Sequence, residues 1–347
     1  MTPFFSHGRP TARTPSASDD RGPTRRAVLG GLAAALVAAP ARAADIRFEH
    51  VFGETVLARP ATRVVSLGFT TQDPLLALGV PPVAVRAWFG DQPNSIWPWA
   101  QPFLDGATPT VIAGEVAMET VASLQPDLIV AIGSGITQDE YAILSQIAPT
   151  LMQPPGAATY ALPWDETTRL LGRALGRETL AEERVAQTRQ LFAEARARHP
   201  DWEGRSAIAA YHFGGETGAF TAEDTRGRFL TELGFRTPEA ITRLGGGNFY
   251  AGLSPEDLSP LDVDLLVWVS SLDAVPDLAA LPMRRLLRAH AQGREVFAGA
   301  LTAGALSFGS VLSLPFALSQ LESDIALALD GDPSTRVSSA DRAGLAP

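Results

Sequence analysis

The chain has 347 residues, of which 46% are hydrophobic, so it is long enough to bury one large core or two medium ones. Its formal net charge of −10 disfavours nucleic acids and anionic lipid surfaces as partners, because both would be repelled. The sequence contains no cysteine, so we expect neither a disulfide framework nor a lipid-attachment cysteine.

The N-terminus resembles a removable export signal. Thr24, Arg25 and Arg26 precede an apolar run at 27–39, which is shorter than the roughly 20 residues needed to cross a bilayer. A small-x-small cleavage pattern follows at 41–43. The paired arginines and mild apolar core are typical of a twin-arginine signal, with an ordinary Sec signal as the alternative. We therefore predict export to the periplasm as a protein that is free of the membrane.

From Arg63 onwards, short β-rich runs alternate with helical ones, which is the βαβ cadence of an α/β domain. The run at 127–132 is apolar almost without alternation, as in a strand covered on both faces. The other expected elements are strands at 64–67, 83–85, 207–211, 264–269 and 294–297, and helices at 72–78, 227–233 and 315–329. The sequence thus predicts α/β structure on both sides of a central helical region.

That central region, 164–198, is predicted to be two helices divided by Gly176. A capping-box pattern at 179–182 predicts the start of the second helix, and His199-Pro200 predicts its end. About twenty residues of helix span roughly 30 Å, so this helix could join two lobes. The polar tail after Asp330 is expected to be disordered at its end.

One pattern occurs once in each half. Glu119 and Glu256 are each followed at matching spacing by two apolar residues and then by an aspartate, Asp127 or Asp264, that opens an apolar strand. We interpret each copy as a short helix with an acidic first turn that leads into a strand.

Several segments resemble iron-siderophore binding proteins of ABC importers. They are 63–67, 117–130 and 137–149 in the first half, and 224–230, 248–250, 306–308 and 314–316 in the second. The resemblance covers nearly all of residues 45–330. It implies an α/β fold of two Rossmann-like lobes joined by a single long rigid helix, the class III periplasmic binding protein architecture. It also implies a ligand held between the lobes, and a protein that is not an enzyme.

On this basis the chain is predicted to have five parts. They are a twin-arginine-type signal peptide at 1–43, an N-terminal α/β lobe at 44–163, a helical segment with the connecting helix at 164–200, a C-terminal α/β lobe at 201–330 and a polar tail at 331–347. Loss of residues 1–43, which hold six Arg and two Asp, would make the protein more acidic still.

The resemblance also implies two partners, a ferric siderophore and an inner-membrane ABC permease, and we expect a monomer. In this family a glutamate on each lobe docks onto arginines of the permease, and the matching positions are Glu119 and Glu256. The alternative is that each glutamate only complements the positive end of its helix. The siderophore is transported cargo, and no intrinsic cofactor is expected.

Candidate ligand-binding residues lie where strands end at the predicted cleft, and family position adds two more. They are Trp88, Phe89, Gly133, Ser134, Gly135, His212, Phe213, Arg226, Trp268 to Ser271, Tyr250 and Phe308. Core packing is an equally weighted alternative for Trp268, and a structural salt bridge is an alternative for Arg226.

The sequence departs from the hydroxamate-binding members of the family at two positions. Those members carry an Arg shortly before the first docking glutamate and a Tyr in the loop that matches 133–135. Here the corresponding residues are Ala113 or Gly114, and Ser134. Arg86 or Arg226 is the candidate for the missing cation, because a guanidinium binds chelate oxygens and stacks on rings. The chemical class of siderophore stays open.

Haem and cobalamin remain alternative cargoes, because their receptors share the predicted fold. A bare metal ion is disfavoured, since the four histidines after the signal, His50, His199, His212 and His290, are scattered. A secreted α/β hydrolase is disfavoured because no G-x-S-x-G string occurs. A sensor or adaptor that keeps the fold without transporting a ligand also stays open.

Overall fold

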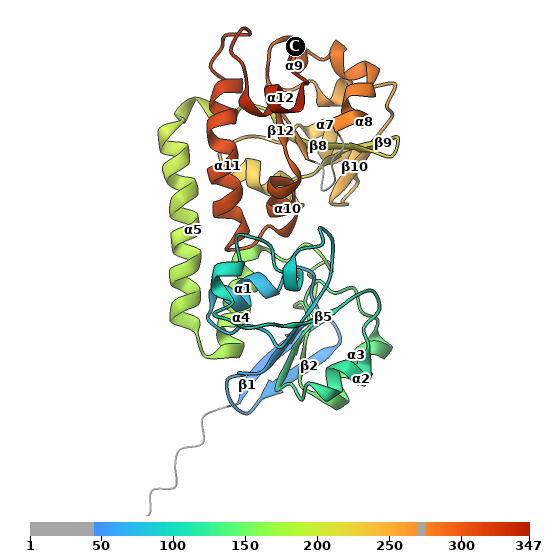
Figure 1. Cartoon of the computed structure of the whole chain (residues 1–347), viewed down its shortest axis with the longest axis vertical. Coiled ribbons are helices and arrows are strands. Elements are labelled where there is room, and N and C mark those ends of the chain that lie inside the picture. Colours follow the sequence, from blue (N-terminus) through green and yellow to red (C-terminus); the bar gives the residue numbers. More distant parts are fainter. Residues whose placement is uncertain (1–44, 270–274) are drawn as a thin grey trace, which may run out of the picture. The chain divides into compact units, whose positions relative to one another are not determined.

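The computed structural model describes residues 45–269 and 275–347. The predicted signal peptide with its arginine pair and cleavage site lies outside the described residues, as do Ser270 and Ser271 at the end of one predicted cleft strand. The described chain forms two α/β lobes, each built on a five-stranded sheet, and one long helix, α5 (Glu178–Arg198), runs alongside both (Figure 1). No helix in the described ranges is both long and apolar enough to cross a membrane.

The sheet of the N-terminal lobe is parallel throughout, in the order β5-β4-β3-β6-β7. Its strands are β3 (Val64–Ser66), β4 (Ala84–Arg86), β5 (Thr110–Ile112), β6 (Leu128–Val130) and β7 (Thr150–Leu151). Both faces of this sheet are covered, because Val64 and Val65 point to opposite faces and both are fully buried. An antiparallel hairpin of β1 (Ile46–His50) and β2 (Gly53–Leu57) precedes it.

Helices pack on both faces of this sheet. They are α1 (Gln72–Ala77) and α4 (Trp164–Leu175) on one side, and α2 (Met118–Ser123) and α3 (Gln138–Ile147) on the other. The start of α3 is fixed by a capping box, in which the Thr137 hydroxyl accepts from the Glu140 N–H and the Glu140 carboxylate accepts from the Thr137 N–H.

The sheet of the C-terminal lobe is mixed, in the order β10-β9-β8-β11-β12. Its strands are β8 (Ala207–Phe213), β9 (Glu216–Phe220), β10 (Tyr250–Leu253), β11 (Leu265–Val269) and β12 (Glu295–Ala298). β8, β11 and β12 are parallel, whereas β9 and β10 run antiparallel to their neighbours. The β8-β9 hairpin turns at Gly214 and Gly215, which both have positive φ, the backbone that a tight hairpin needs. This glycine pair marked a hairpin that the sequence analysis did not predict.

Seven helices are described in the C-terminal lobe. They are α6 (Thr225–Glu232), α7 (Glu239–Gly245), α8 (Val275–Ala280), α9 (Arg288–Ala291), α10 (Ala300–Phe308), α11 (Ser313–Ala328) and α12 (Ser338–Ala343). The polar tail is not disordered as expected, because α12 packs on the lobe and Val337, Ala340 and Leu345 are buried. The Ser339 N–H also donates to the Asp324 carboxylate.

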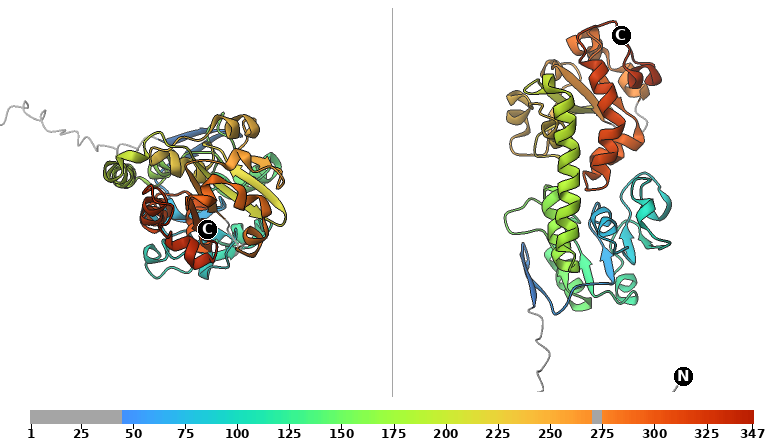
Figure 2. Two further views of the ribbon diagram at one scale, coloured as in Figure 1. Left: turned by 90° about the horizontal axis from the view of Figure 1, so that it is seen from above. Right: turned by 90° about the vertical axis from the view of Figure 1, so that its left-hand side faces the viewer.

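The break at Gly176 is confirmed, since α4 ends there in a left-handed conformation with φ of 62°. The predicted capping box at 179–182 is wrong, because α5 begins at Glu178 and Thr179 is already inside the helix. α5 runs along both lobes (Figure 2). Its Arg184 Nε donates to the Ala77 carbonyl of one lobe, and its Thr188 hydroxyl donates to the Val311 carbonyl of the other. It therefore connects the lobes as predicted.

The two lobes also share one hydrophobic core. Trp97 and Trp99 of the N-terminal lobe stack with ring centroids 5.0 Å apart, and both contact Phe308 of α10. Trp97 lies directly on Gly304 of α10, at a position where any Cβ would overlap its ring. The lobes are thus held together by aromatic packing as well as by α5.

Candidate functional site

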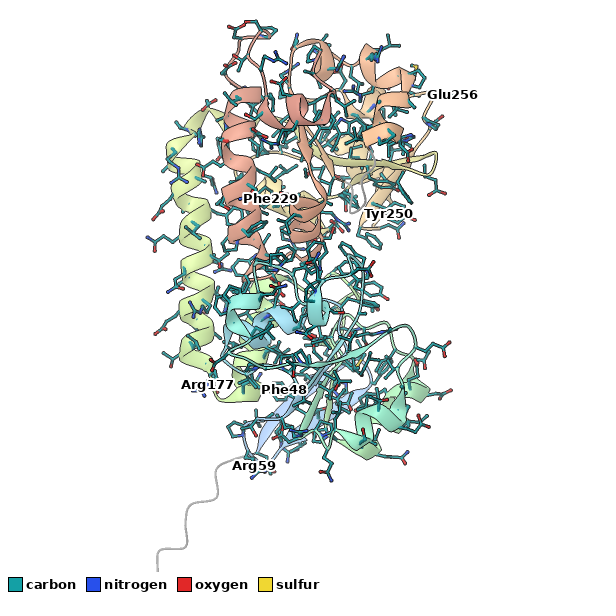
Figure 3. The ribbon with its side chains drawn as sticks, viewed as in Figure 1. Phe48, Arg59, Arg177, Phe229, Tyr250 and Glu256 are labelled. Atoms are coloured by element: carbon teal, nitrogen blue, oxygen red, sulfur yellow. The ribbon has the colours of Figure 1, made fainter. Side chains whose placement is uncertain are left out.

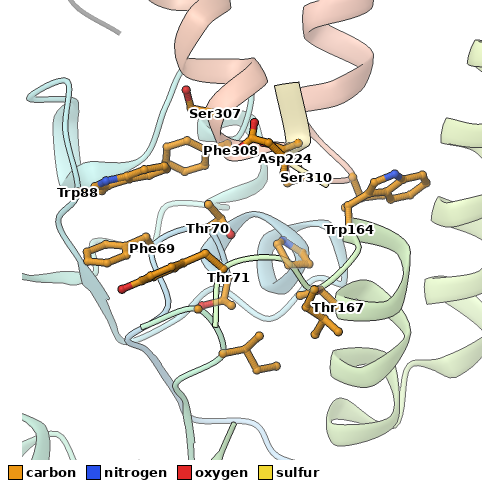
Figure 4. Close-up of a pocket in the computed structure, with 18 of the residues that line it drawn as sticks. Phe69, Thr70, Thr71, Trp88, Trp164, Thr167, Asp224, Ser307, Phe308 and Ser310 are labelled. Atoms are coloured by element: carbon orange, nitrogen blue, oxygen red, sulfur yellow. The ribbon is translucent and has the colours of Figure 1, made fainter. Parts of the chain in front are cut away.

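A cavity of about 340 Å³ is lined by residues of both lobes. Its volume lies in the range of small-molecule sites. Six aromatic residues line it: Phe69, Trp88, Tyr160, Trp164, Phe249 and Phe308. Eight hydroxyl residues also line it: Thr70, Thr71, Thr159, Thr167, Thr168, Thr225, Ser307 and Ser310. Figure 4 shows Phe69, Thr70 and Thr71 facing Ser307, Phe308 and Ser310 of the other lobe across this space.

The rings of Phe69, Trp88 and Phe308 form one wall of the cavity. The Trp88 centroid lies 5.7 Å from that of Phe69 and 5.6 Å from that of Phe308 (Figure 4). Trp88 is 43% exposed, whereas Phe308 is buried in the shared core. The wall therefore offers a partly exposed indole that packs against Phe308, a ring of the shared core.

Two charged residues, Asp224 and Arg226, line the cavity. Asp224 caps α6 by accepting from the Arg226 N–H, and its carboxylate also binds the Arg226 guanidinium through two bonds of 2.7 Å. The guanidinium carbon lies 3.7 Å from the centroid of the Phe220 ring. Arg226 is therefore held in one orientation, and its charge is compensated by its neighbour.

Arg86, the other predicted cation, is not among the residues that line the cavity. Its Nε donates to the Gly114 carbonyl and its Nη1 donates to the Ser134 carbonyl at 2.9 Å. Its guanidinium also stacks on Phe69, 4.7 Å from the ring centroid. Arg86 thus holds two loops and supports an aromatic wall residue.

Behind the lining, one buried carboxylate and one half-buried carboxylate bridge the lobes. Asp73 of α1 accepts from the Trp99 indole at 2.8 Å and from the Ser310 hydroxyl at 2.6 Å. Burial raises the pKa of Asp73 to about 6, against the effect of these two hydrogen bonds. Glu232 of α6 accepts from the Trp164 indole at 2.9 Å, and burial raises its pKa as well.

Three of the predicted ligand-binding residues, Trp88, Arg226 and Phe308, line this cavity together. Phe89 lies behind them, with its ring 4.6 Å from Trp88. Ser134 is buried and its hydroxyl donates to the Ala131 carbonyl, so it faces the loop and not the cavity.

Gly135 does not line the cavity but permits a residue that does. A Cβ at this position would overlap the hydroxyl of Tyr160, so the glycine allows that ring to approach the loop. Of the three candidate loop residues, Gly133 lines the cavity, together with Tyr160, which packs against Gly135.

Trp268 is placed in the core, which corrects the cleft assignment. It is 1% exposed, and its indole donates to the buried Glu295 carboxylate at 2.7 Å. The reason is that β11 is a central strand with all five residues buried, so its side chains have no access to the cavity.

Phe213 and Tyr250 are exposed residues of the C-terminal lobe that lie outside the cavity lining. Phe213 is 51% exposed at the β8-β9 hairpin. Tyr250 is 44% exposed, lies on the side of its lobe that faces the N-terminal lobe (Figure 3) and contacts Phe249, which does line the cavity. Their role in ligand binding stays a prediction.

The sequence analysis missed four of the lining aromatics: Phe69, Tyr160, Trp164 and Phe249. Phe69 could have been found, because it follows β3 and parallel strands bind ligands at their carboxyl ends. Tyr160 and Trp164 come from a loop and a helix start that no strand pattern predicts.

The two predicted docking glutamates are both exposed. Glu119 lies in the first turn of α2, as expected. Glu256 lies in a turn between β10 and a 3₁₀ helix at Ser259–Leu261, so the helix expected there is absent and the helix-end alternative does not apply to it. Within 45–269 and 275–347, neither carboxylate pairs with an arginine, and Figure 3 shows Glu256 at the outer edge of its lobe.

No group of three or more His, Cys, Asp or Glu side chains is arranged to hold a metal ion in the described part of the chain. The lining consists of aromatic rings, aliphatic side chains, hydroxyls and the Asp224–Arg226 pair. These groups suit a bulky ligand that presents both apolar surface and hydrogen-bonding oxygens.

Comparison with known proteins identifies relatives over most of the chain. The ferric enterobactin-binding periplasmic protein FepB of Escherichia coli O6:H1 is 29% identical over 294 residues, 78% of this chain and 89% of the relative. The probable siderophore-binding lipoprotein YfiY of Bacillus subtilis is 27% identical over 231 residues, 63% of this chain and 67% of the relative.

Among solved structures, a periplasmic solute binding protein of Mycobacterium smegmatis matches with a TM-score of 0.73 and 34% identity, over 82% of this chain and 99% of its own. Streptococcus pneumoniae PiaA in complex with ferrichrome shares the fold, with a TM-score of 0.69 and 22% identity over 83% of this chain and 99% of its own. The two lobes and single connecting helix are those of a class III binding protein. The periplasmic binding protein family model matches residues 64–296, and the chain belongs to that family.

Proposed function

We propose that this protein captures a ferric siderophore in the cavity between its lobes and delivers it to an inner-membrane ABC permease for iron uptake. The observation that carries the proposal is the lining, in which aromatic rings and hydroxyls from both lobes surround one compensated arginine. A siderophore already fills the coordination shell of its iron, so its receptor needs ring faces and hydrogen bonds and supplies no metal ligand.

The names of the relatives support this cargo. FepB is named for ferric enterobactin and YfiY for a siderophore, and both align with most of their own length. Within the cavity, we assign Trp88 and Phe308 to contact with the apolar parts of the chelate. Arg226 would donate to its oxygens through the N–H groups that Asp224 does not occupy.

We further propose that Glu119 and Glu256 dock onto arginines of the permease, one from each lobe. Their support is that both are exposed and neither is paired with an arginine in the described chain. Two contacts on separate lobes would define the orientation in which the protein binds.

The proposal extends to export and assembly. Residues 1–43 are proposed to act as a twin-arginine signal, and the mature protein to be a periplasmic monomer. The protein would bind and release its cargo without any covalent step, and it would need no resident cofactor.

Isothermal titration calorimetry of the purified protein tests the cargo. The probes are ferric hydroxamate, catecholate and citrate chelates, the same chelators without iron, haem and cobalamin. We expect saturable binding of at least one ferric class with a Kd below about 1 μM. If only haem or cobalamin binds, the fold assignment stands but a ferric siderophore is not the cargo. If no probe binds, the result favours a sensor.

A further inference from the structure

The charges around the cavity restrict the charge of the cargo. Asp224 and Arg226 are the charged residues among its lining, and they form a bidentate pair with both oxygens and two guanidinium nitrogens engaged. A pair of this kind contributes hydrogen bonds to a ligand but no net positive charge.

The residues behind the lining do not add an uncompensated positive charge either. Two lining groups, Trp164 and Ser310, donate to the carboxylates of Glu232 and Asp73, so negative groups lie behind the cavity on the side of α1 and α6. Arg86 is not among the lining residues. Its guanidinium donates to two carbonyls and stacks on the lining ring of Phe69.

The net charge of a ferric chelate depends on the charges of the donor groups that bind its iron. Three singly charged hydroxamates cancel the charge of ferric iron, whereas three doubly charged catecholates leave a trianion. A citrate chelate keeps ionised carboxylates and is also an anion. Moving such an anion out of water is unfavourable unless cations compensate it, and this cavity offers no uncompensated one in its described lining.

We infer that the cavity selects ferric chelates without net negative charge, the tris-hydroxamate class, over catecholate and citrate chelates. This inference rests on the function proposed above and narrows its substrate class. Sequence similarity to known proteins does not predict this selectivity, because the relative FepB is named for ferric enterobactin, a catecholate chelate.

Calorimetric titration with ferrichrome, ferric enterobactin and ferric dicitrate tests the inference. We expect ferrichrome to bind at least about a hundredfold more tightly than either anionic chelate, because their charge would be desolvated beside Asp224, Asp73 and Glu232. Tighter binding of enterobactin or dicitrate would overturn the charge rule and leave siderophore binding intact. Binding of none of the three, with a response to haem or cobalamin, would instead overturn the proposed function.

The variant Asp224→Asn tests the cause of the selection. Asparagine keeps an oxygen for the cap of α6 but leaves the charge of Arg226 uncompensated. The affinity for each anionic chelate, relative to the affinity for ferrichrome, should rise about tenfold or more, because an uncompensated guanidinium attracts an anion.

A matched control is Glu223→Gln, which removes the same charge from an exposed neighbour outside the lining and should change neither affinity. If Asp224→Asn fails to fold, Glu232→Gln provides the second test, because it removes a charge behind Trp164 and keeps a hydrogen-bond acceptor. Unchanged selectivity in the folded variants would overturn the inference.

Discussion

The hydroxyl of Ser310 in the C-terminal lobe donates a 2.6 Å hydrogen bond to the carboxylate of Asp73 in the N-terminal lobe. Asp73 is fully buried, and its second oxygen has no hydrogen-bond partner in the described structure. Ser310 lines the cavity, so this bond fixes part of the binding site to the interface between the lobes. It joins the two lobes through a group whose charge depends on pH.

The first prediction concerns stability against pH. The folded-state pKa of Asp73 is raised from 3.8 to about 6, so the folded protein holds this proton more tightly than the unfolded chain. The contribution to stability is therefore present below pH 3.8 and is lost as the pH rises through about 6. The loss should reach about 2 to 3 kcal/mol, because one pKa unit is worth roughly 1.4 kcal/mol.

Asp73→Asn isolates this effect, since asparagine does not titrate. Urea unfolding of both proteins from about pH 4 to pH 7 should show the wild type losing stability relative to the variant. A difference that stays constant over this range would contradict the buried ionisation.

The second prediction concerns the aromatic wall. Trp88→Ala should weaken binding of the ferric chelate roughly tenfold or more, because it removes the free ring face of the cavity. The unfolding free energy should change by less than about 1 kcal/mol, since the side chain is 43% exposed. Ile143→Ala, which removes an apolar side chain that is 48% exposed and lies outside the lining, should leave affinity unchanged. Equal losses in both variants would show that the cavity is not the binding site.

The third prediction concerns the packing between lobes. Gly304→Ala should cost about 1 to 3 kcal/mol of stability, because its Cβ would meet Trp97 ring carbons at 2.6 and 2.7 Å. Gly252→Ala is the control, since a Cβ there has no neighbour within 4 Å. Thermal unfolding would compare the two, and equal melting temperatures would show that Trp97 can move without cost.

The fourth prediction concerns docking. The double variant Glu119→Ala with Glu256→Ala should abolish siderophore-dependent uptake, while the Kd for the ferric chelate stays within about twofold. A control pair, Glu183→Ala with Glu223→Ala, removes the same charge from two other exposed positions. Normal uptake by the first pair, or an equal loss in the control pair, would contradict the docking assignment.

The sequence predicted those helix ends that depend on a local residue such as glycine or proline. The break at Gly176 was predictable because helices commonly end at a left-handed glycine. The end of α5 was predictable because Pro200 follows it. The helix expected at Glu256 did not form, since Ser254 and Asp257 instead accept local backbone hydrogen bonds that stabilise turns.

The site was only partly predictable, because it depends on contacts between distant segments. Trp88 and Phe308 lie more than two hundred positions apart and meet only when the lobes pack. Trp268 resembled a cleft residue by its place near a strand end, yet the sheet order makes β11 central and buries it. The compensation of Arg226 by Asp224 was not recognised, although the two residues are nearly adjacent in the chain.

The most direct test of the central claim is a crystal structure of the protein with a ferric siderophore, with the iron located by its anomalous scattering. The account predicts one iron between the lobes, with its chelate against Trp88 and Phe308 and within hydrogen-bonding distance of Arg226. An iron bound elsewhere on the protein, or a cavity that stays free of chelate at saturating concentration, would contradict it.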